Sequence, residues 1–368
     1  MKIPYVNLKA QWNIEKKDLL PIIKKVFSDG KYVIGEEIEK FEKNISKVCN
    51  TKYAVALNSG TDALTMGLKL LGVKKGDEVI TPPNSFISST TSITHIGAKP
   101  IFVDVIKDQN IDASKIEKKI TKKTKAIMPV HLSGRSCEMD KINHLSKKFR
   151  IPIIEDAAQS IGSKFRGKYV GTFGEVGCFS AHPLKNLNAI GDAGYLVTNN
   201  SKIATSARLL RNHGIQNRNQ ILSFGYVSRM DNLQASILNL RLKKLNEIVK
   251  KRRSNANLYF KNLKNIKNLK LPIEKKDEFN TYHTFIIKVK NRDKLKRYLE
   301  KKGIGTTIHY PHLIFEQIAY KKRFKKVKIE KYKIAKDLRK KILTLPINQF
   351  ITSKEIIKIC NEIKKFYK

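Results

Sequence analysis

The chain has 368 residues, 41% of them hydrophobic, and its 74 Lys and Arg against 32 Asp and Glu give a net charge of +42. This length allows one large α/β domain plus a smaller one, and no stretch approaches the roughly 18 uncharged apolar residues of a membrane span. The lysines are spread along the whole chain without a basic tail, zinc-finger spacing or ribonucleoprotein motif, which favours a solvated surface and no specific nucleic-acid partner. The four cysteines lack metal-ligand spacing and the start of the chain lacks a signal peptide's apolar core, so we expect reduced thiols, no metal site and a cytoplasmic protein.

Two helical patterns open the chain, at residues 18–27 and 37–48, and from residue 51 short apolar runs alternate with helical patterns. The predicted strands cover residues 53–57, 78–81, 99–105, 125–131, 151–154, 176–180 and 195–198. The predicted helices among them cover residues 61–70, 85–95 and 139–148. This rhythm predicts an α/β fold with a three-layer, mostly parallel sheet.

A long amphipathic helix is predicted at residues 232–251, leading out of this sheet domain. Beyond it the pattern predicts a strand at 282–289 and helices at 292–302, 331–341 and 353–367. We therefore expect two domains: residues 1–250 form an N-terminal arm and a large domain, and residues 251–368 form a small α+β domain.

The most informative segment begins as a fully apolar strand and ends in an acid, Asp156, and is followed by Lys185 within a run of Pro, Asn and Gly residues. Ligands of open α/β sheets gather at the carboxyl ends of such strands. A carboxylate and a lysine in one pocket suit pyridoxal phosphate, because the lysine forms the Schiff base and the carboxylate holds the pyridine nitrogen protonated. The alternative for Asp156 alone is an ordinary helix cap.

Three further features also follow predicted strands. Ser59, Gly60 and Thr61 precede a helix, where backbone amides and hydroxyls can cradle a phosphate, although the same residues could be a simple cap. Phe86 follows the next strand and could be either a ring-stacking face or core, and Ser180 ends the strand before Lys185. Together these features supply a phosphate site, a stacking face, an acid and an amine at one sheet edge.

At these residues the chain resembles the DegT/DnrJ/EryC1/StrS family of sugar aminotransferases, which are fold-type I pyridoxal-phosphate enzymes. The resemblance covers nearly the whole length. The matching segments include residues 3–11, 30–35, 59–64, 76–80, 97–104, 129–132, 155–159, 182–186, 228–235, 305–311 and 345–347.

The resemblance implies a role for each site residue. Lys185 would be the Schiff-base lysine and proton carrier, and Asp156 would pair with the pyridine nitrogen. The other cofactor contacts would be Gln159 to the ring hydroxyl, Phe86 on the ring face, and Gly60, Thr61 and Ser180 to the phosphate. Members of the family are homodimers that share site residues, so the stretch around Arg229 would serve the partner subunit, and His309 and Tyr310 would lie on the substrate side.

Two positions depart from the family pattern. The family often has Asn where this chain has Val227, so one hydrogen bond to the partner's phosphate site would be missing or replaced. The common Gly-Glu-Gly-Gly loop reads Gly191-Asp192-Ala193-Gly194, which could change the shape of that loop. The lysine itself is present, whereas the dehydratase branch has histidine there, and this favours transamination.

The sequence thus predicts a pyridoxal-phosphate-dependent aminotransferase that moves an amino group from glutamate to a keto sugar. The acceptor would be nucleotide-linked and the product would feed surface-polysaccharide synthesis, lipopolysaccharide included. A free eight-carbon keto-sugar acid with an aldehyde is the alternative acceptor. An inactive regulator or a basic nucleic-acid binder is the alternative of another class.

Overall fold

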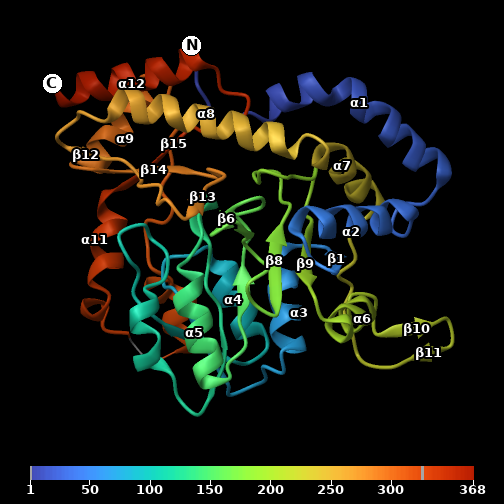
Figure 1. Cartoon of the computed structure of the whole chain (residues 1–368). Helices are drawn as coiled ribbons and strands as arrows, with labels where there is room; N and C mark the ends of the chain where they lie inside the picture. Colours follow the sequence, from blue (N-terminus) through green and yellow to red (C-terminus); the bar gives the residue numbers. More distant parts are fainter. Residues whose placement is uncertain (1, 325–326) are drawn as a thin grey trace.

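The computed structural model describes residues 2–324 and 327–368 (Figure 1). Two groups of strands joined by isolated bridges make up its central sheet. A four-stranded part has the order β1-β9-β8-β5 and a three-stranded part the order β3-β2-β4. Parallel bridges from Ile127 to Ile153 and from Val130 to Asp156 join the two parts between β4 and β5. The bounds are β1 (Tyr53–Leu57), β2 (Glu78–Thr81), β3 (Lys99–Phe102), β4 (Thr124–Ile127), β5 (Ile154–Asp156), β8 (Val176–Ser180) and β9 (Gly194–Thr198). This is the predicted mostly parallel sheet, in which β9 runs antiparallel to both of its neighbours.

The sheet carries apolar side chains on both faces, as a strand covered from both sides requires. In β9, Leu196 packs into the cluster with α3 and α6, whereas Tyr195 and Val197 pack into the cluster with α2 and α7. Tyr195 stacks on Phe179 of β8 with ring centroids 5.0 Å apart. The covering helices are α2 (Glu36–Cys49), α3 (Gly60–Leu70), α4 (Ile87–His95), α5 (Met139–Phe149), α6 (Ser201–Leu210) and α7 (Asn232–Leu242). The result is the predicted three-layer architecture.

The first helix is much longer than predicted: α1 spans Leu8–Asp29 instead of residues 18–27. It begins at Asn7, whose side chain accepts a hydrogen bond from the backbone N–H of Ala10 at 3.0 Å. Pro21 lies inside the helix, where it removes one helical hydrogen bond without ending the helix.

The predicted helix at residues 232–251 was wrong, since two helices occupy this segment. Between α7 and α8 (Leu245–Leu263) the backbone of Lys244 leaves the helical region with φ −98° and ψ 3°. No glycine or proline marks this break. Its cause is tertiary, because α7 packs against α1 and α2, whereas α8 packs against α12 (Ser353–Tyr367).

A second core lies around an antiparallel sheet of order β12-β14-β15. Tyr259 of α8, Phe285 of β14 and Ile363 of α12 are fully buried in it, and Ile3 from the start of the chain packs there too. The remaining elements are β12 (Leu269–Lys270), β14 (Phe285–Val289), β15 (Ile342–Leu345), α9 (Arg292–Lys301), α10 (Ile318–Arg323), α11 (Lys333–Lys341), the three-stranded sheet of β13 (Glu278–Phe279), β6 (Lys164–Phe165) and β7 (Lys168–Tyr169), and the hairpin of β10 (Ile215–Asn217) and β11 (Gln220–Ile221). The domain boundary predicted at residue 250 falls within α8 and stays a prediction.

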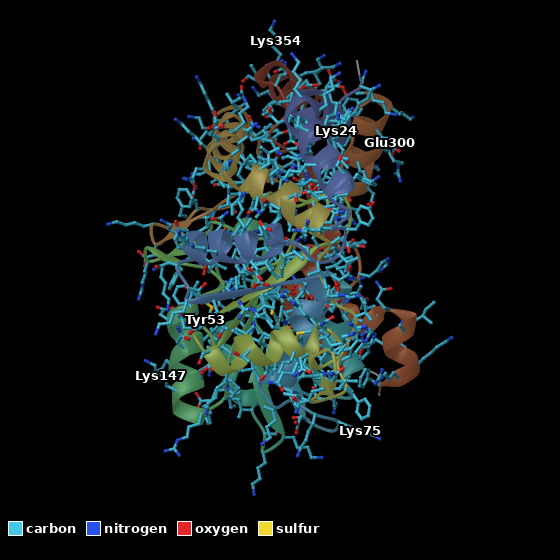
Figure 2. All side chains as sticks on the ribbon, turned by 90° about the vertical axis from the view of Figure 1, so that its right-hand side faces the viewer. Lys24, Tyr53, Lys75, Lys147, Glu300 and Lys354 are labelled. Carbon is cyan, nitrogen blue, oxygen red and sulfur yellow. The ribbon has the colours of Figure 1, made fainter. Side chains whose placement is uncertain are left out.

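The excess positive charge is distributed over the molecule and not gathered in one place. Figure 2 shows Lys24 and Lys354 toward one end and Lys75 and Lys147 toward the other, on four different segments. Within the described ranges, no helix combines the length and apolarity that crossing a membrane would require.

Candidate active site

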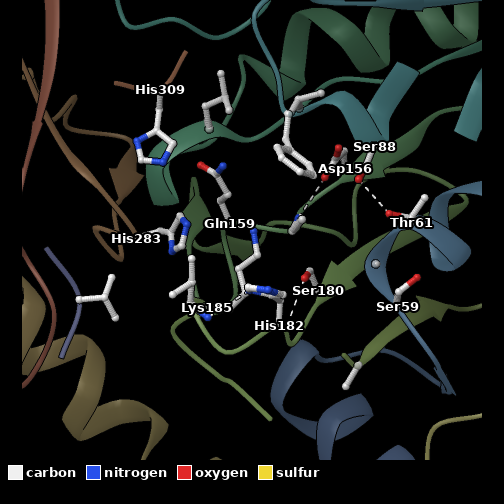
Figure 3. Close-up of a pocket in the computed structure, with 18 of the residues that line it drawn as sticks. Ser59, Thr61, Ser88, Asp156, Gln159, Ser180, His182, Lys185, His283 and His309 are labelled. Atoms are coloured by element: carbon white, nitrogen blue, oxygen red, sulfur yellow. Dashed lines mark hydrogen bonds between the residues drawn. The ribbon is translucent and has the colours of Figure 1, made fainter. Parts of the chain in front are cut away.

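A cavity of about 310 Å³ lies at the carboxyl ends of the parallel strands (Figure 3). It forms where β1, β2, β5 and β8 run into their following loops and helices. Nine of the ten predicted site residues line it: Gly60, Thr61, Phe86, Asp156, Gln159, Ser180, Lys185, His309 and Tyr310. The tenth, Arg229, lies outside. The expectation that separate strand ends would meet at one edge of the sheet is therefore met in this chain.

Lys185 is held in a loop after β8 and its side chain points into the cavity (Figure 3). Asn188, three residues on, exchanges side-chain hydrogen bonds with Gln11 of α1 at 3.0 and 3.1 Å. Arg241 of α7 donates to the carbonyls of Asn188 and Ala189 and pairs with Glu15 at 2.6 Å. These buried contacts fix the loop and with it the position of the amine.

Burial in the cavity lowers the pKa of Lys185 from 10.5 to about 8, and the nearby Asp156 carboxylate opposes this shift. A neutral amine is therefore accessible close to physiological pH. Such an amine is a nucleophile and can also accept a proton.

Asp156 ends β5 and is 5% exposed. Its carboxylate accepts hydrogen bonds from the Ser89 hydroxyl at 2.7 Å and from the Ala158 N–H at 3.2 Å. Burial raises the pKa of Asp156, while those two hydrogen bonds and Lys185 act against the rise. The positive charge around the Asp156 carboxylate therefore does not offset the cost of its burial. A protonated nitrogen base bound in the cavity would stabilise the carboxylate further.

A second buried acid, Glu155, braces the strand end from the other face. Its carboxylate accepts the backbone N–H groups of Gly171, Phe173 and Gly174 at 2.6–2.7 Å. It also contacts Nε2 of His131 at 3.0 Å, and His131 Nδ1 accepts from the Cys137 N–H at 3.0 Å. Because Nδ1 accepts a hydrogen bond, the ring proton of His131 lies on Nε2, and Nε2 donates a hydrogen bond to the Glu155 carboxylate.

The start of α3 forms an anion cradle. Ser59 caps the helix by accepting from the Asp62 N–H at 3.1 Å, so the first helical amides point toward the cavity end of the helix. At Gly60 a Cβ atom would come within 2.7 Å of the Ser180 Cβ, so only glycine permits this close approach. The Thr61 hydroxyl donates to the Ser88 hydroxyl at 2.8 Å, which adds Ser88 to the rim.

The remaining predicted residues lie around the same space. Gln159 is oriented by the Ser133 N–H, which donates to its carbonyl oxygen at 2.8 Å, and its amide donates to the Tyr310 hydroxyl at 3.2 Å. His309 contacts the Thr344 hydroxyl at 3.0 Å, and burial together with Lys185 lowers the pKa of His309 to about 4. Phe86 lies at the rim with 57% of its surface exposed, so its ring is available to a ligand.

Arg229 and Val227 lie away from this cavity. Arg229 donates to the Asn212 side chain at 3.0 Å, and Val227 is 62% exposed and forms an antiparallel bridge with Asn212. The departure at Ala193 is accommodated by the fold, since Ala193 is fully buried and does not have a positive φ. Gly194 keeps its necessary role, because a Cβ there would lie 2.3 Å from the Ser59 carbonyl carbon.

Several cavity residues were not predicted from sequence. Tyr5 comes from the N-terminal arm, Arg252 from α8, His283 from the segment before β14 and Asn348 from the loop after β15. Only Tyr5 falls in a segment that matches the family, residues 3–11, and none of the four was assigned a role. They meet only when the second core packs over the sheet edge.

Comparisons with known proteins agree over nearly the full length. The model of the DegT/DnrJ/EryC1/StrS aminotransferase family matches residues 13–364. A dTDP-3-amino-3,6-dideoxy-alpha-D-galactopyranose transaminase of Aneurinibacillus thermoaerophilus is 36% identical, covering 99% of both chains. A UDP-N-acetyl-3-dehydro-alpha-D-glucosamine 3-aminotransferase of Acidithiobacillus ferrooxidans is 35% identical, covering 99% of this chain and 97% of the relative. Among solved structures, S. venezuelae DesV in complex with a ketimine intermediate has a TM-score of 0.96 at 32% identity, covering 100% of this chain and 99% of DesV.

Proposed function

The chain belongs to the DegT/DnrJ/EryC1/StrS aminotransferase family. From this premise we propose that the enzyme transfers an amino group from glutamate to a nucleotide-linked keto sugar, with Lys185 and Asp156 as its central catalytic residues. It is a pyridoxal-phosphate-dependent sugar aminotransferase of the fold-type I class. The observation that carries the assignment of residues is the single cavity in which a buried carboxylate, a lysine of lowered pKa and a helix N-terminus face one space.

The residues in the cavity suit pyridoxal phosphate. When bound, the cofactor supplies an electron sink that allows the amino group to be carried between two substrates. The start of α3 with Gly60, Thr61 and Ser180 would hold the phosphate, and Asp156 would balance the charge of the ring nitrogen. Gln159 would contact the ring hydroxyl and Phe86 would cover the ring face.

Lys185 would hold the cofactor covalently and then take and return a proton at the substrate carbon. His309 has a lowered pKa, so it is neutral at physiological pH and adds no second positive charge beside this amine. His309 and Tyr310 would contact the substrate from the opposite wall.

The test uses the two halves of the reaction separately. Purified enzyme is mixed with L-glutamate, and the released cofactor is analysed for pyridoxamine phosphate. A panel of nucleotide-linked keto sugars is then added and amino-sugar product is identified by mass spectrometry. If only the free eight-carbon aldehyde acid is aminated, this acid and not a nucleotide-linked sugar is the acceptor. If another amino acid converts the cofactor and glutamate does not, that amino acid is the donor. We further propose that the product serves surface-polysaccharide synthesis in the cytoplasm.

The pH dependence of cofactor attachment is a direct consequence of the Lys185 environment. Because its pKa is about 8, the reactive neutral amine increases as the pH rises through 8 and is nearly complete about one unit above. The initial rate of attachment to cofactor-free protein, followed by visible absorption, should reach half its maximum near pH 8. A rate that continues to rise up to about pH 10, as for an ordinary lysine, would contradict this environment.

We propose that the protein is a homodimer. The first helix and the segment after it expose many large apolar side chains, which a monomer in water rarely does. These are Leu8, Trp12, Ile14, Leu20, Phe27, Tyr32, Val33 and Ile34, with 39–69% of each exposed. Phe224, beyond the β10–β11 hairpin, is 99% exposed. In the dimer, Arg229 would serve the partner's site.

Val227→Asn tests how the partner's phosphate is held. If Val227 faces that phosphate, asparagine should tighten cofactor binding by at most the 1.5–3 kcal/mol or so of a hydrogen bond to a charged group. Titration of cofactor-free protein with pyridoxal phosphate measures the change. Weaker binding together with a lower melting temperature would mean instead that Val227 packs in the interface, where an amide is buried without a partner.

A further inference from the structure

Arg252 is a buried cation on the wall of the cavity that comes from α8. It is 4% exposed, and among described residues only Arg135 and Arg241 are buried to a similar degree. Both of those arginines are paired, Arg135 with Glu278 at 2.9 Å and Arg241 with Glu15 at 2.6 Å. Over the ranges that the structure covers, no carboxylate lies within 4.0 Å of Arg252. Among the three buried arginines of the described ranges, Arg252 is therefore the one without a counter-ion.

The groups that do contact Arg252 are neutral. One terminal nitrogen donates to the carbonyls of Tyr282 and His283 at 3.1 and 3.2 Å, and the other donates to the Gln349 side chain at 3.0 Å. Its Nε has no partner in the described structure. Burial lowers the pKa of Arg252 to about 10, and among the groups around it only Tyr5 acts in the other direction. A buried charge in this state is costly unless an anion joins it.

The neighbouring wall offers donors and no acid. The Nδ1 atom of the half-buried His283 is inaccessible and has no partner in the described chain, and desolvation beside Lys185 and Arg252 holds the pKa of His283 well below the usual value. Of the described residues that line the cavity, the only acids are Asp156 and Asp192. Asp156 ends β5 and Asp192 precedes β9, so both belong to the sheet, not to the wall formed by α8.

We propose that Arg252 binds a carboxylate group of the substrate that occupies the cavity with the cofactor. The inference rests on the proposed function, in which an amino acid and a keto sugar enter this space in turn. The carboxylate can come from the amino donor or from an acidic sugar. The planar guanidinium can form two parallel hydrogen bonds to either.

The competing explanation is structural. Arg252 joins α8 to the segment before β14 and to Gln349 through the hydrogen bonds described above, and this alone would make it important for folding. A test must therefore measure ligand binding to folded, cofactor-loaded protein and not turnover alone.

The test is calorimetric titration of the cofactor-loaded protein with succinate, a dicarboxylate that cannot react, and with uncharged succinamide. The variants are Arg252→Gln, Arg252→Lys and Arg253→Gln. The adjacent Arg253 is the matched control, since it pairs with Glu274 at 2.6 Å and does not line the cavity. Melting temperature and cofactor content are recorded for each protein.

Wild type should bind succinate in preference to succinamide, and Arg252→Gln should weaken succinate binding by about 10- to 100-fold. Arg252→Lys should also bind more weakly, because lysine keeps the charge but loses the forked geometry. Arg253→Gln should behave as wild type. Equal succinate affinity in folded Arg252→Gln or Arg252→Lys, or no preference for succinate in wild type, would overturn the proposal.

Two kinetic arms then identify the source of the carboxylate. A loss confined to the glutamate half-reaction assigns it to the donor, and a loss confined to acidic keto sugars assigns it to the acceptor. If succinate binding depends on Arg252 but no keto sugar is aminated, the proposed function fails and this inference stands. If amination is normal but Arg252→Gln changes neither binding nor either half-reaction, the inference fails and the function stands.

Discussion

Replacing Lys185 with alanine is expected to lower the transamination rate by more than about a thousandfold and to abolish covalent attachment of the cofactor. The reason is that the cavity offers no second amine in its place, since Lys185 is the only lysine among its described lining residues. Alanine removes both the nucleophile and the group that carries the proton.

The fold should survive this change. The loop around Lys185 is fixed by Asn188, Gln11 and Arg241, and in the described part of the chain the Lys185 amine makes no hydrogen bond. We expect an unchanged melting temperature for the cofactor-free protein, measured by circular dichroism. Lys147→Ala on the exposed face of α5 is the control and should keep full activity. A folded Lys185→Ala protein that retained more than about a thousandth of the wild-type rate would remove Lys185 from the mechanism.

The sheet was predictable because its strands are covered on both faces and short. Continuous apolar runs such as β1, β8 and β9 place apolar side chains in the cores on both faces of the sheet. The bounds of these three strands agree with the predicted bounds to within one residue. The site followed from the same logic, since residues directly after parallel strands must share one edge. Asp156, Gly60 and Lys185 could be brought together on that basis without knowledge of any other contact.

The other wall of the cavity was not predictable from local patterns. Arg252 and His283 lie in segments whose apolar spacing predicts the local helix or strand but not which part of the molecule that element will contact. They reach the cavity because α8 breaks away from α7 at Lys244 and carries the second core over the sheet edge. That break has no glycine or proline and arises from tertiary packing, which a single sequence does not encode at one position.

Asp156→Asn is expected to leave the cofactor bound while lowering the transamination rate by about 10- to 100-fold. Asparagine matches aspartate in shape. Its carbonyl oxygen can still accept the Ala158 N–H, and its amide can donate to the Ser89 hydroxyl, which bonds the other carboxylate oxygen in the wild type. What it lacks is the negative charge that would keep the ring nitrogen protonated, and such a charge-assisted hydrogen bond contributes about 3 kcal/mol at its strongest. Asp156→Ala should be no less impaired, and it would leave the Ser89 hydroxyl with only the Phe86 carbonyl at 3.3 Å as an acceptor in the described structure.

The control must be a buried carboxylate with a purely structural role, and Asp104 meets this requirement. It is 4% exposed, lies outside the cavity, and accepts backbone N–H groups at the start of α11. Asp104→Asn should lower the melting temperature and leave the rate of the glutamate half-reaction unchanged. Asp156→Asn should lower that rate and leave the melting temperature unchanged. Stopped-flow absorbance of the bound cofactor measures that rate for both proteins. If Asp156→Asn reacted at a near-normal rate and only its stability fell, Asp156 would be a helix-type cap and the nitrogen of the cofactor would need another partner.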